Sequence, residues 1–325
     1  MKVIEVNNLV KKYNDFTAVD NINFSVDEGE VFGFLGPNGA GKSTTIKILS
    51  TLLKLTSGEA YLNGYDVQKE PNQVRSSIGL VFQETTLDER LTAKENLVFH
   101  AMLYGIPKKI YQKRLQQVLE IVELTDRVDT LVKTFSGGMK RRLEIARGLL
   151  HYPKVIFLDE PTVGLDLQTR SRIWEYIHQL RKTEGVTIFL TTHYMDEAEN
   201  CNRIAIIDNG KIVALNTPEK LKERVSGDIV KMASADNNRL YKKLVDELGL
   251  KAELIKDGIQ LEAAKGETFI PQLISKLPNE ITYISLRKPT LNDVFLKLTG
   301  REIREELLDG KEIMRARLGR RSRFK

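Results

Sequence analysis

The residues best suited to chemistry form a glycine-rich loop near the N-terminus. Its glycines allow successive backbone N–H groups to turn toward phosphate oxygens, and the start of the following helix adds a partial positive charge. Lys42 can reach the β- and γ-phosphates of a nucleotide, and the Ser43 hydroxyl can ligate magnesium. The loop matches the pattern G-x-x-x-x-G-K-[ST] and consists of Gly36, Pro37, Asn38, Gly39, Ala40, Gly41, Lys42, Ser43 and Thr44. It predicts binding of ATP with Mg²⁺.

Two acidic residues follow a short apolar run further along the chain. Val155–Leu158 predicts a buried strand, which ends in Asp159 and Glu160. Ligands of open α/β sheets bind at the carboxyl ends of strands, so this strand would present both carboxylates to the nucleotide. Asp159 is expected to hold magnesium, directly or through water. Glu160 points to the other side and is expected to activate the attacking water. Taken alone, such a pair also fits a solvated turn; behind a complete phosphate loop it predicts hydrolysis.

Alternating strands and helices in the first 224 residues predict the scaffold that positions these groups. This alternation is typical of an α/β architecture with a largely parallel sheet. A helix is expected from Lys42 to about Leu53, directly after the loop. The block Thr92–Leu150 interrupts the alternation with helices and predicts an inserted subdomain at about 92–150. The main strands are expected at Val3–Val6, Ile22–Val26, Val31–Leu35, Ile78–Phe82, Val155–Leu158, Val186–Leu190, Ile204–Ile207 and Lys211–Ala214.

Residues 225–300 have a different rhythm and predict a small α+β domain. The expected order β-α-β-β-α-β suggests a ferredoxin-like unit. The four strands are expected at Asp228–Met232, Ala252–Ile255, Ile259–Glu262 and Ile281–Leu286, and the two helices between them at Asn238–Leu248 and Thr268–Leu277. A last helix, Leu291–Leu298, carries an apolar stripe. We expect the stripe to pack on its own domain, with a dimer or regulatory contact as the alternative.

Composition and charge exclude several classes of protein. Hydrophobic residues make up 41% and charged residues 29%, which is typical of a soluble globular chain. No apolar run approaches the roughly 18 residues that span a bilayer. The single cysteine, Cys201, excludes a disulfide framework and fits a reducing cytosol. Lys311–Lys325 holds seven basic residues and one acid, and so accounts for the whole net charge of +6. This tail, 301–325, could be a solvated charge run, an anionic-lipid contact or a nucleic-acid contact.

A second potential phosphate site lies at Ser136, Gly137 and Gly138. Ser136 can cap a helix with its hydroxyl, and the glycines allow an anion to approach the backbone. Within Phe135–Met139 these residues are similar to the signature motif LSGGQ of ATP-binding cassette (ABC) proteins, with Met139 in place of the usual glutamine. The first 220 or so residues thus resemble an ABC domain. The resemblance implies a P-loop NTPase fold with a mostly parallel sheet, an antiparallel β part and an inserted helical subdomain.

Four further positions fit the family pattern, each with a plainer alternative. Gln83 resembles the Q-loop glutamine, which contacts magnesium or water and couples the nucleotide to a membrane partner; an exposed loop residue is the alternative. Asp166 in Gly164-Leu165-Asp166 resembles the D-loop, or a routine turn. His193 resembles the switch histidine that contacts the γ-phosphate and holds Glu160 and its water, or is an ordinary histidine at a strand end. Tyr13 occupies the place of a ring that stacks on adenine, or is a structural tyrosine.

The resemblance also implies how the chain works and with which partners. In the family, two cassettes form a homodimer in the ATP state, each phosphate loop opposite the other's signature helix. Lys288–Gly300 looks like the C-terminal end of daunorubicin-resistance exporter ATPases. Such proteins lie at the inner, cytoplasmic face of the membrane, drive a separate permease and need no specific nucleic acid. A soluble ABC protein of repair or translation is the alternative, although only 93 residues (43–135) separate Lys42 from Ser136 and one cassette is present.

Overall fold

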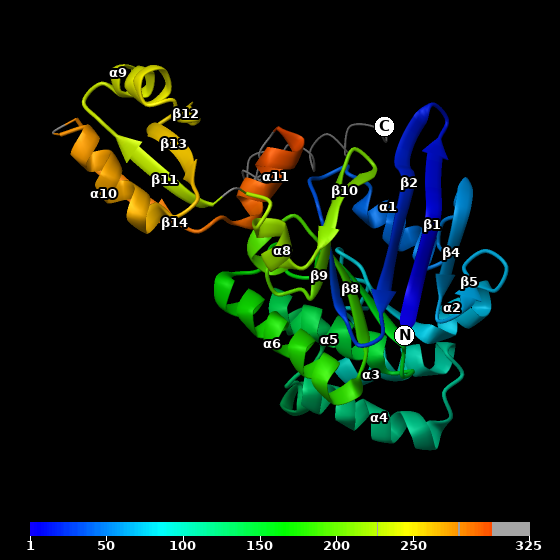
Figure 1. Cartoon of the computed structure of the whole chain (residues 1–325). Coiled ribbons are helices and arrows are strands. Elements are labelled where there is room, and N and C mark those ends of the chain that lie inside the picture. The colour runs from blue at the N-terminus through cyan, green and yellow to red at the C-terminus, as the bar shows by residue number, and fades with distance from the viewer. Residues whose placement is uncertain (226, 279, 301–325) are drawn as a thin grey trace, which may run out of the picture.

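The computed structural model describes residues 1–225, 227–278 and 280–300. A six-stranded sheet lies at the centre of its larger part (Figure 1). Five of its strands run parallel, since parallel neighbours are joined by long crossover connections that contain helices. The sixth, β10, pairs antiparallel at one edge. In spatial order the strands are β10 (Lys211–Asn216), β9 (Arg203–Asp208), β3 (Val31–Leu35), β8 (Thr187–Thr192), β7 (Val155–Asp159) and β6 (Ile78–Val81). The expected parallel sheet is present.

An antiparallel sheet covers one face of the central sheet. It consists of β2 (Phe16–Asp27), β1 (Lys2–Tyr13), β4 (Ser57–Leu62) and β5 (Tyr65–Asp66), in that order. Phe24, Phe32, Phe34 and Phe189 form an aromatic cluster between the two sheets, with ring centroids 5.4 to 6.5 Å apart. Helix α1 (Lys42–Leu49) packs in the same core and ends earlier than Leu53, because Thr51 adopts a positive φ of 64°. Helix α2 (Pro71–Ser77) precedes β6.

Helices cover the opposite face of the central sheet (Figure 1). The block expected to be helical contains α3 (Ala93–Leu103), α4 (Lys108–Ile121) and α5 (Gly137–Leu149). Thr92 begins α3 with a capping box, and Gly105 at a φ of 63° separates α3 from α4, so the helical pattern is not continuous to Leu124. Short 3₁₀ turns at Thr125–Arg127 and Val132–Thr134 lead to α5. Three further helices, α6 (Leu167–Glu184), α7 (Met195–Ala198) and α8 (Pro218–Lys222), complete this part.

Residues 228–287 form a separate antiparallel sheet. Its strands lie in the order β12 (Ala252–Ile255), β13 (Gly258–Ala263), β11 (Asp228–Ala233), β14 (Tyr283–Arg287). Helix α9 (Asn237–Lys242) continues through a π-helical turn, Lys243–Glu247, and α10 (Gly266–Lys276) precedes β14. This is the β-α-β-β-α-β order expected for a ferredoxin-like unit. The helices pack on one face over a core that includes Val230 and Met232.

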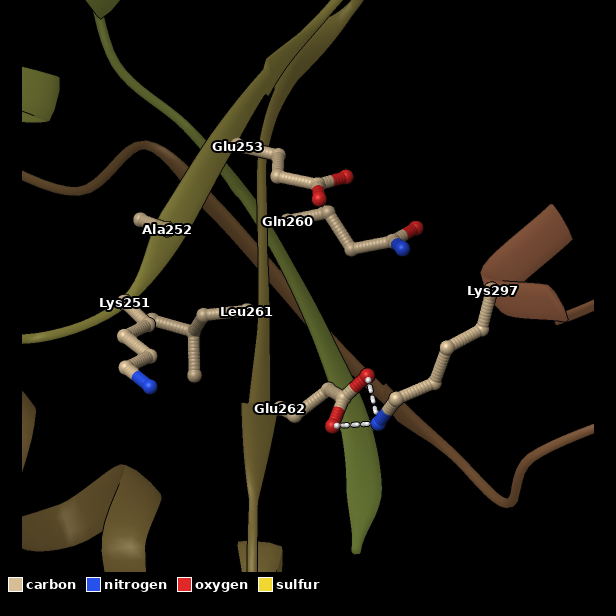
Figure 2. A pocket seen from close by; sticks show the side chains of 7 residues that line it. All are labelled: Lys251, Ala252, Glu253, Gln260, Leu261, Glu262 and Lys297. Atoms are coloured by element: carbon tan, nitrogen blue, oxygen red, sulfur yellow. Dashed lines mark hydrogen bonds and ion pairs between the residues drawn. The ribbon is translucent and has the colours of Figure 1, made fainter. Parts of the chain in front are cut away.

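The other face of this small sheet is polar. Glu253, Gln260 and Glu262 point from it into a cavity of about 510 Å³, and Lys297 reaches in from the last helix, α11 (Leu291–Thr299) (Figure 2). The ammonium of Lys297 lies 3.1 Å from a Glu262 oxygen. Ile229 of β11 lies on this same face and is buried, in the core that also contains the stripe of α11.

Helix α11 packs on the larger part of the molecule, so our expectation that its stripe packs on its own domain is wrong. Helix α11 lies beside α8 (Figure 1). Its residues Leu291, Val294 and Phe295 are buried in the same core as Leu221 of α8, Val225 and Ile229. Helix α11 also contacts α7, which directly follows the segment that contains His193. The chain therefore leaves the first core, builds the small sheet and returns. Among the described residues, no helix has the length and hydrophobicity required to cross a bilayer. The basic tail, 301–325, lies outside the described residues.

Candidate active site

The phosphate loop joins β3 to α1 at the carboxyl end of the central sheet. Gly36 and Gly41 are required by close contacts: a Cβ on Gly36 would lie 2.3 Å from the Ile207 carbonyl oxygen, and one on Gly41 would lie 2.6 Å from that of Ala18. Gly41 also has a φ of 106°, which side chains rarely adopt. The tip residues Asn38 and Gly39 are exposed. The loop therefore brings its backbone to the surface at a helix N-terminus, the arrangement that binds phosphate.

Lys42 lies buried at the start of α1 and points back across the loop. Its ammonium donates to the carbonyl oxygens of Gly36, at 2.8 Å, and Pro37, at 3.2 Å. It also lies 3.2 Å from Glu160 Oε1. Burial lowers the pKa of Lys42, and the adjacent Glu160 carboxylate opposes that shift. The ammonium thus lies between the loop and the acid that the sequence predicts to act on water.

Asp159 and Ser43 bring two oxygen ligands together. Ser43 Oγ donates to Asp159 Oδ1 at 3.1 Å, and Thr191 Oγ1 donates to the same oxygen at 2.6 Å. Hydroxyl and carboxylate oxygens are the donors that Mg²⁺ prefers. Among the described residues, no group of three or more His, Cys, Asp or Glu side chains could hold a metal. The pair supplies two oxygen ligands beside the phosphate loop.

Glu160 occupies a strained position that is held from both sides. Its φ is 48°, in the left-handed region, which costs about 1 kcal/mol or more for a residue other than glycine. Its backbone N–H donates to Thr191, and its Oε1 lies 3.3 Å from His193 Nδ1. Burial raises the pKa of Glu160, but His193 and Lys42 together outweigh burial and hold it below the usual carboxyl value. The side chain is therefore ionised at neutral pH, as a group that orients water must be.

The remaining predicted residues lie apart from this cluster. Ser136 caps α5, accepting from the Met139 N–H at 3.3 Å, and Asp166 caps α6, accepting from the Thr169 N–H at 2.9 Å. Gln83 is exposed after β6. Within the described residues, no hydrogen bond or ion pair joins these residues or Tyr13 to Lys42 or Glu160. Gly137 is exposed, and Gly138 is buried so close to Thr169 that a Cβ would lie 2.5 Å from its methyl group. Tyr13 is 45% exposed, with the Lys11 ammonium 4.9 Å from its ring centroid.

Sequence reasoning missed a group of buried supporting residues. Thr191 and Thr192 end β8 directly before His193, so their place at a strand end could have identified them. Glu197, on α7, accepts hydrogen bonds from the Thr162 and Thr192 hydroxyls. Arg141, on α5, donates to carbonyl groups at the ends of β6 and β7. No local pattern distinguishes Glu197 or Arg141 from their charged neighbours.

The chain is similar in sequence to known proteins. A family model described as ABC transporter matches residues 19–163. The linearmycin resistance ATP-binding protein LnrL of Bacillus subtilis is 40% identical over 312 residues, covering 93% of this chain and 100% of that protein. The chain belongs to the ABC transporter ATP-binding family. The daunorubicin/doxorubicin resistance ATP-binding protein DrrA of Streptomyces peucetius is 39% identical over 92% of this chain and 93% of its own length.

Solved ABC cassettes share the fold. The dimeric structure of the bacterial cassette MJ0796 superposes with a TM-score of 0.60 at 30% identity, covering 66% of this chain and 98% of that one. Another ABC ATP-binding subunit gives 0.62 at 32% identity, covering 68% and 92%. The predicted P-loop NTPase cassette fold and ATPase class are therefore confirmed.

Proposed function

We propose that this chain is the ATP-hydrolysing subunit of an exporter and that it drives a separate membrane permease. The observation that carries the proposal is the position of Glu160 Oε1, which lies 3.2 Å from Lys42 Nζ and 3.3 Å from His193 Nδ1 beside the phosphate loop. One carboxylate is thereby placed next to a phosphate-binding cation and a switchable imidazole. Phosphoryl transfer to water needs these elements.

Each side chain has a defined task in the proposed reaction. Lys42 exchanges its bonds to the loop carbonyls for bonds to the β- and γ-phosphates of ATP. Ser43 and Asp159 would hold Mg²⁺, whose charge stabilises the phosphates during transfer, and Gln83 would complete that contact. Glu160 accepts a hydrogen bond from the attacking water and orients it toward the γ-phosphorus. His193 donates to the γ-phosphate and fixes Glu160.

We propose that two copies complete each site. Ser136, Gly137 and Asp166 lie on exposed surface, and in the described part of the chain no hydrogen bond or ion pair joins them to Lys42 or Glu160. An exposed, serine-capped helix N-terminus can bind the γ-phosphate held by another copy. Dimeric solved cassettes at 30% identity support this assembly. ATP then joins the two copies, and hydrolysis releases them. Tyr13, at the end of β1, is proposed to stack on the adenine ring.

Relatives and one surface support a permease partner. Related proteins carry names that include linearmycin resistance, daunorubicin resistance and Nod factor export. Large apolar side chains are exposed on α3, where Phe99 is 59%, Met102 68% and Leu103 68% exposed. Exposed apolar groups this close together mark a protein contact. We therefore place the chain at the inner face of the cell membrane. We also propose that it consists of a cassette at 1–224, a small domain at 225–300 and a tail at 301–325.

The first experiment measures ATP binding, dimer formation and phosphate release with the purified chain. Lys42→Ala should abolish nucleotide binding, because the buried cation that donates to the loop carbonyls is lost. Glu160→Gln should bind ATP and accumulate as a closed dimer, since the neutral amide cannot orient water in the same way. Turnover by Glu160→Gln at the wild-type rate would refute the role of this acid.

A second experiment identifies the partner. The chain should co-purify with an integral membrane protein when expressed with the permease encoded beside it. Phe99→Asp together with Leu103→Asp should weaken that association, because two charges would be placed in an apolar contact, but should leave ATP binding intact. Stable association with ribosomes or DNA in place of a membrane protein would favour the soluble translation or repair alternative.

A further inference from the structure

Arg141 is on α5, the helix that Ser136 caps, and its side chain is buried between this helix and the ends of β6 and β7. It is 6% exposed and sits in the second turn of α5. Nε donates to the Pro161 carbonyl oxygen at 2.7 Å, and Nη2 donates to those of Asp159, at 3.0 Å, and Glu160, at 3.1 Å. Nη1 donates to the Phe82 carbonyl oxygen. One planar guanidinium thus holds three consecutive carbonyl groups around Glu160 and a fourth at the end of the neighbouring strand.

These contacts act on the backbone position that is hardest to maintain. Glu160 has a φ of 48°, and a non-glycine residue keeps such a conformation only where its surroundings fix it. Thr191 fixes the N–H side of Glu160, accepting at 3.0 Å through its hydroxyl. Arg141 fixes the carbonyl side. Without the guanidinium, these carbonyl groups lose a charged donor, and the Glu160 carbonyl keeps a long bond from the Val163 N–H, at 3.4 Å, so the peptide groups can rotate. The direction of the Glu160 carboxylate would change with them.

The same helix also holds the segment that contains Gln83. Phe82, whose carbonyl accepts from Arg141, directly precedes Gln83. Glu144, one turn further along α5, lies 3.3 Å from Arg141 Nη1 and accepts from the Thr86 N–H at 2.8 Å. Both ends of this loop are therefore bonded to α5. A shift of α5 would therefore move the turn at Asp159–Pro161, here called the catalytic turn, together with the loop that contains Gln83.

We propose that Arg141 is a positioning residue that fixes Glu160 of its own chain from the helix whose N-terminus, at Ser136, serves the partner's nucleotide. The inference rests on the proposed function, because it assumes that Glu160 orients water and that Ser136 faces a second copy. Each signature helix then acts at both sites. It binds the γ-phosphate of one nucleotide at its N-terminus and, five residues later, sets the catalytic carboxylate for the other.

The test uses two variants of Arg141 and a control on the same helix. Arg141→Gln keeps a hydrogen-bond donor but loses the planar fork, and Arg141→Lys keeps the charge with fewer simultaneous contacts. Arg142→Gln is the control. Its guanidinium donates to the Val122 carbonyl oxygen at 3.0 Å and to Tyr176 Oη at 3.1 Å, away from the catalytic turn. Thermal unfolding, nucleotide affinity, ATP-driven dimer formation and phosphate release are measured for all four proteins.

We expect a separation between hydrolysis and binding. Arg141→Gln should lower kcat about tenfold or more, the effect of a shift of about 1.4 kcal/mol in the barrier, with nucleotide affinity within about threefold of wild type. Its ATP-bound dimer should accumulate, as with Glu160→Gln, because closure needs the phosphate loop and Ser136 but reopening needs hydrolysis. Arg141→Lys should show a smaller loss of the same kind. Arg142→Gln should hydrolyse ATP at the wild-type rate.

Other outcomes overturn the inference. If the Arg141 variants bind ATP but fail to dimerise, the residue supports the signature end and not Glu160. If the Arg141 variants hydrolyse ATP at the wild-type rate, or no more slowly than Arg142→Gln, Arg141 does not position Glu160. In a Glu160→Gln background, Arg141→Lys should reduce single-turnover hydrolysis no further, because both changes act on one group. An additive loss would contradict this.

A replacement variant and the wild-type control distinguish the remaining outcomes. If Arg141→Gln does not fold, the comparison rests on Arg141→Lys at a temperature where its thermal unfolding has not begun. Wild-type protein that neither binds nor hydrolyses ATP would overturn the proposed function itself. Wild-type hydrolysis together with unaffected Arg141 variants would overturn only the role of Arg141.

Discussion

Removal of the Phe295 ring should destabilise the cassette, although the residue follows the small sheet in sequence. Phe295 is fully buried, and its core also contains Leu221 of α8, which precedes that sheet. Truncation of a buried phenylalanine to alanine costs about 3–5 kcal/mol. With an unfolding slope of about 3 kcal/mol per M urea, the lower value shifts the midpoint by about 1 M. Phe295→Ala should therefore unfold at clearly lower urea.

The chain contains its own reporter for this measurement. Trp174 is the one tryptophan in the sequence, and it is buried on α6 in the same core as Phe295. Its fluorescence follows unfolding of the cassette. Leu273→Ala is the matched control, because Leu273 is equally buried but lies in the separate core of the small sheet. It should leave the Trp174 transition within about 0.5 kcal/mol of wild type, as expected for independent sites.

The result that would refute this reasoning is an unchanged Trp174 transition in Phe295→Ala. It would mean that α11 contributes nothing to the cassette core and that its stripe is free to serve another surface. A shift caused equally by Leu273→Ala would mean that the two cores unfold together. In that case the assay could not assign α11 to either core, and only the pairing of Phe295 with Val225 in a double-mutant cycle would confirm the contact.

Three further predictions concern the site and the tail. Glu197→Ala should slow phosphate release about tenfold, because Thr192 beside His193 loses its acceptor, whereas Glu197→Gln should keep within about threefold of wild type. Burial raises the pKa of Glu197 above 4.5, although Thr192 and Arg170 oppose the shift, so the folded chain binds the proton more tightly than the unfolded one. Wild-type stability should therefore fall as pH rises from 4.5 through the raised pKa, and the Tm of Glu197→Gln relative to wild type should rise over the same window. Deletion of 301–325 should abolish binding to anionic liposomes at low salt if the tail contacts lipid; salt-independent binding by both proteins would exclude that role.

The sequence predicted the elements that have local signals. The phosphate loop carries its glycine and lysine spacing, and the apolar runs Val31–Leu35 and Val155–Leu158 became buried parallel strands as expected. Lys42, Ser43, Asp159, Glu160 and His193 lie together because each follows or ends a strand at one edge of the sheet. Strand order in the small unit was also predictable, since four strands and two helices in that order favour one compact arrangement.

Contacts between segments distant in sequence were not predictable. The core that buries the stripe of α11 contains both Leu221 of α8 and Ile229 of the small sheet, and no local pattern in the sequence predicts these two contacts. Arg141 and Arg142 are adjacent arginines in one basic run. The helix turns one toward the catalytic strand ends and the other toward Tyr176, and this depends on how α5 packs.

Buried charged side chains are concentrated at the carboxyl edge of the central sheet. This distribution indicates that the geometry of the site matters more there than the stability of the fold. Nine charged side chains are buried among the described residues. Six of them lie around the ends of β6, β7 and β8: Lys42, Arg141, Glu144, Asp159, Glu160 and Glu197. Buried ion pairs are often no more stabilising than apolar residues of similar size. Their concentration where Glu160 is strained therefore needs another reason. A fixed set of charges can hold a carboxylate in place before the substrate arrives, and variants that neutralise the supporting members should lose turnover before they lose the fold.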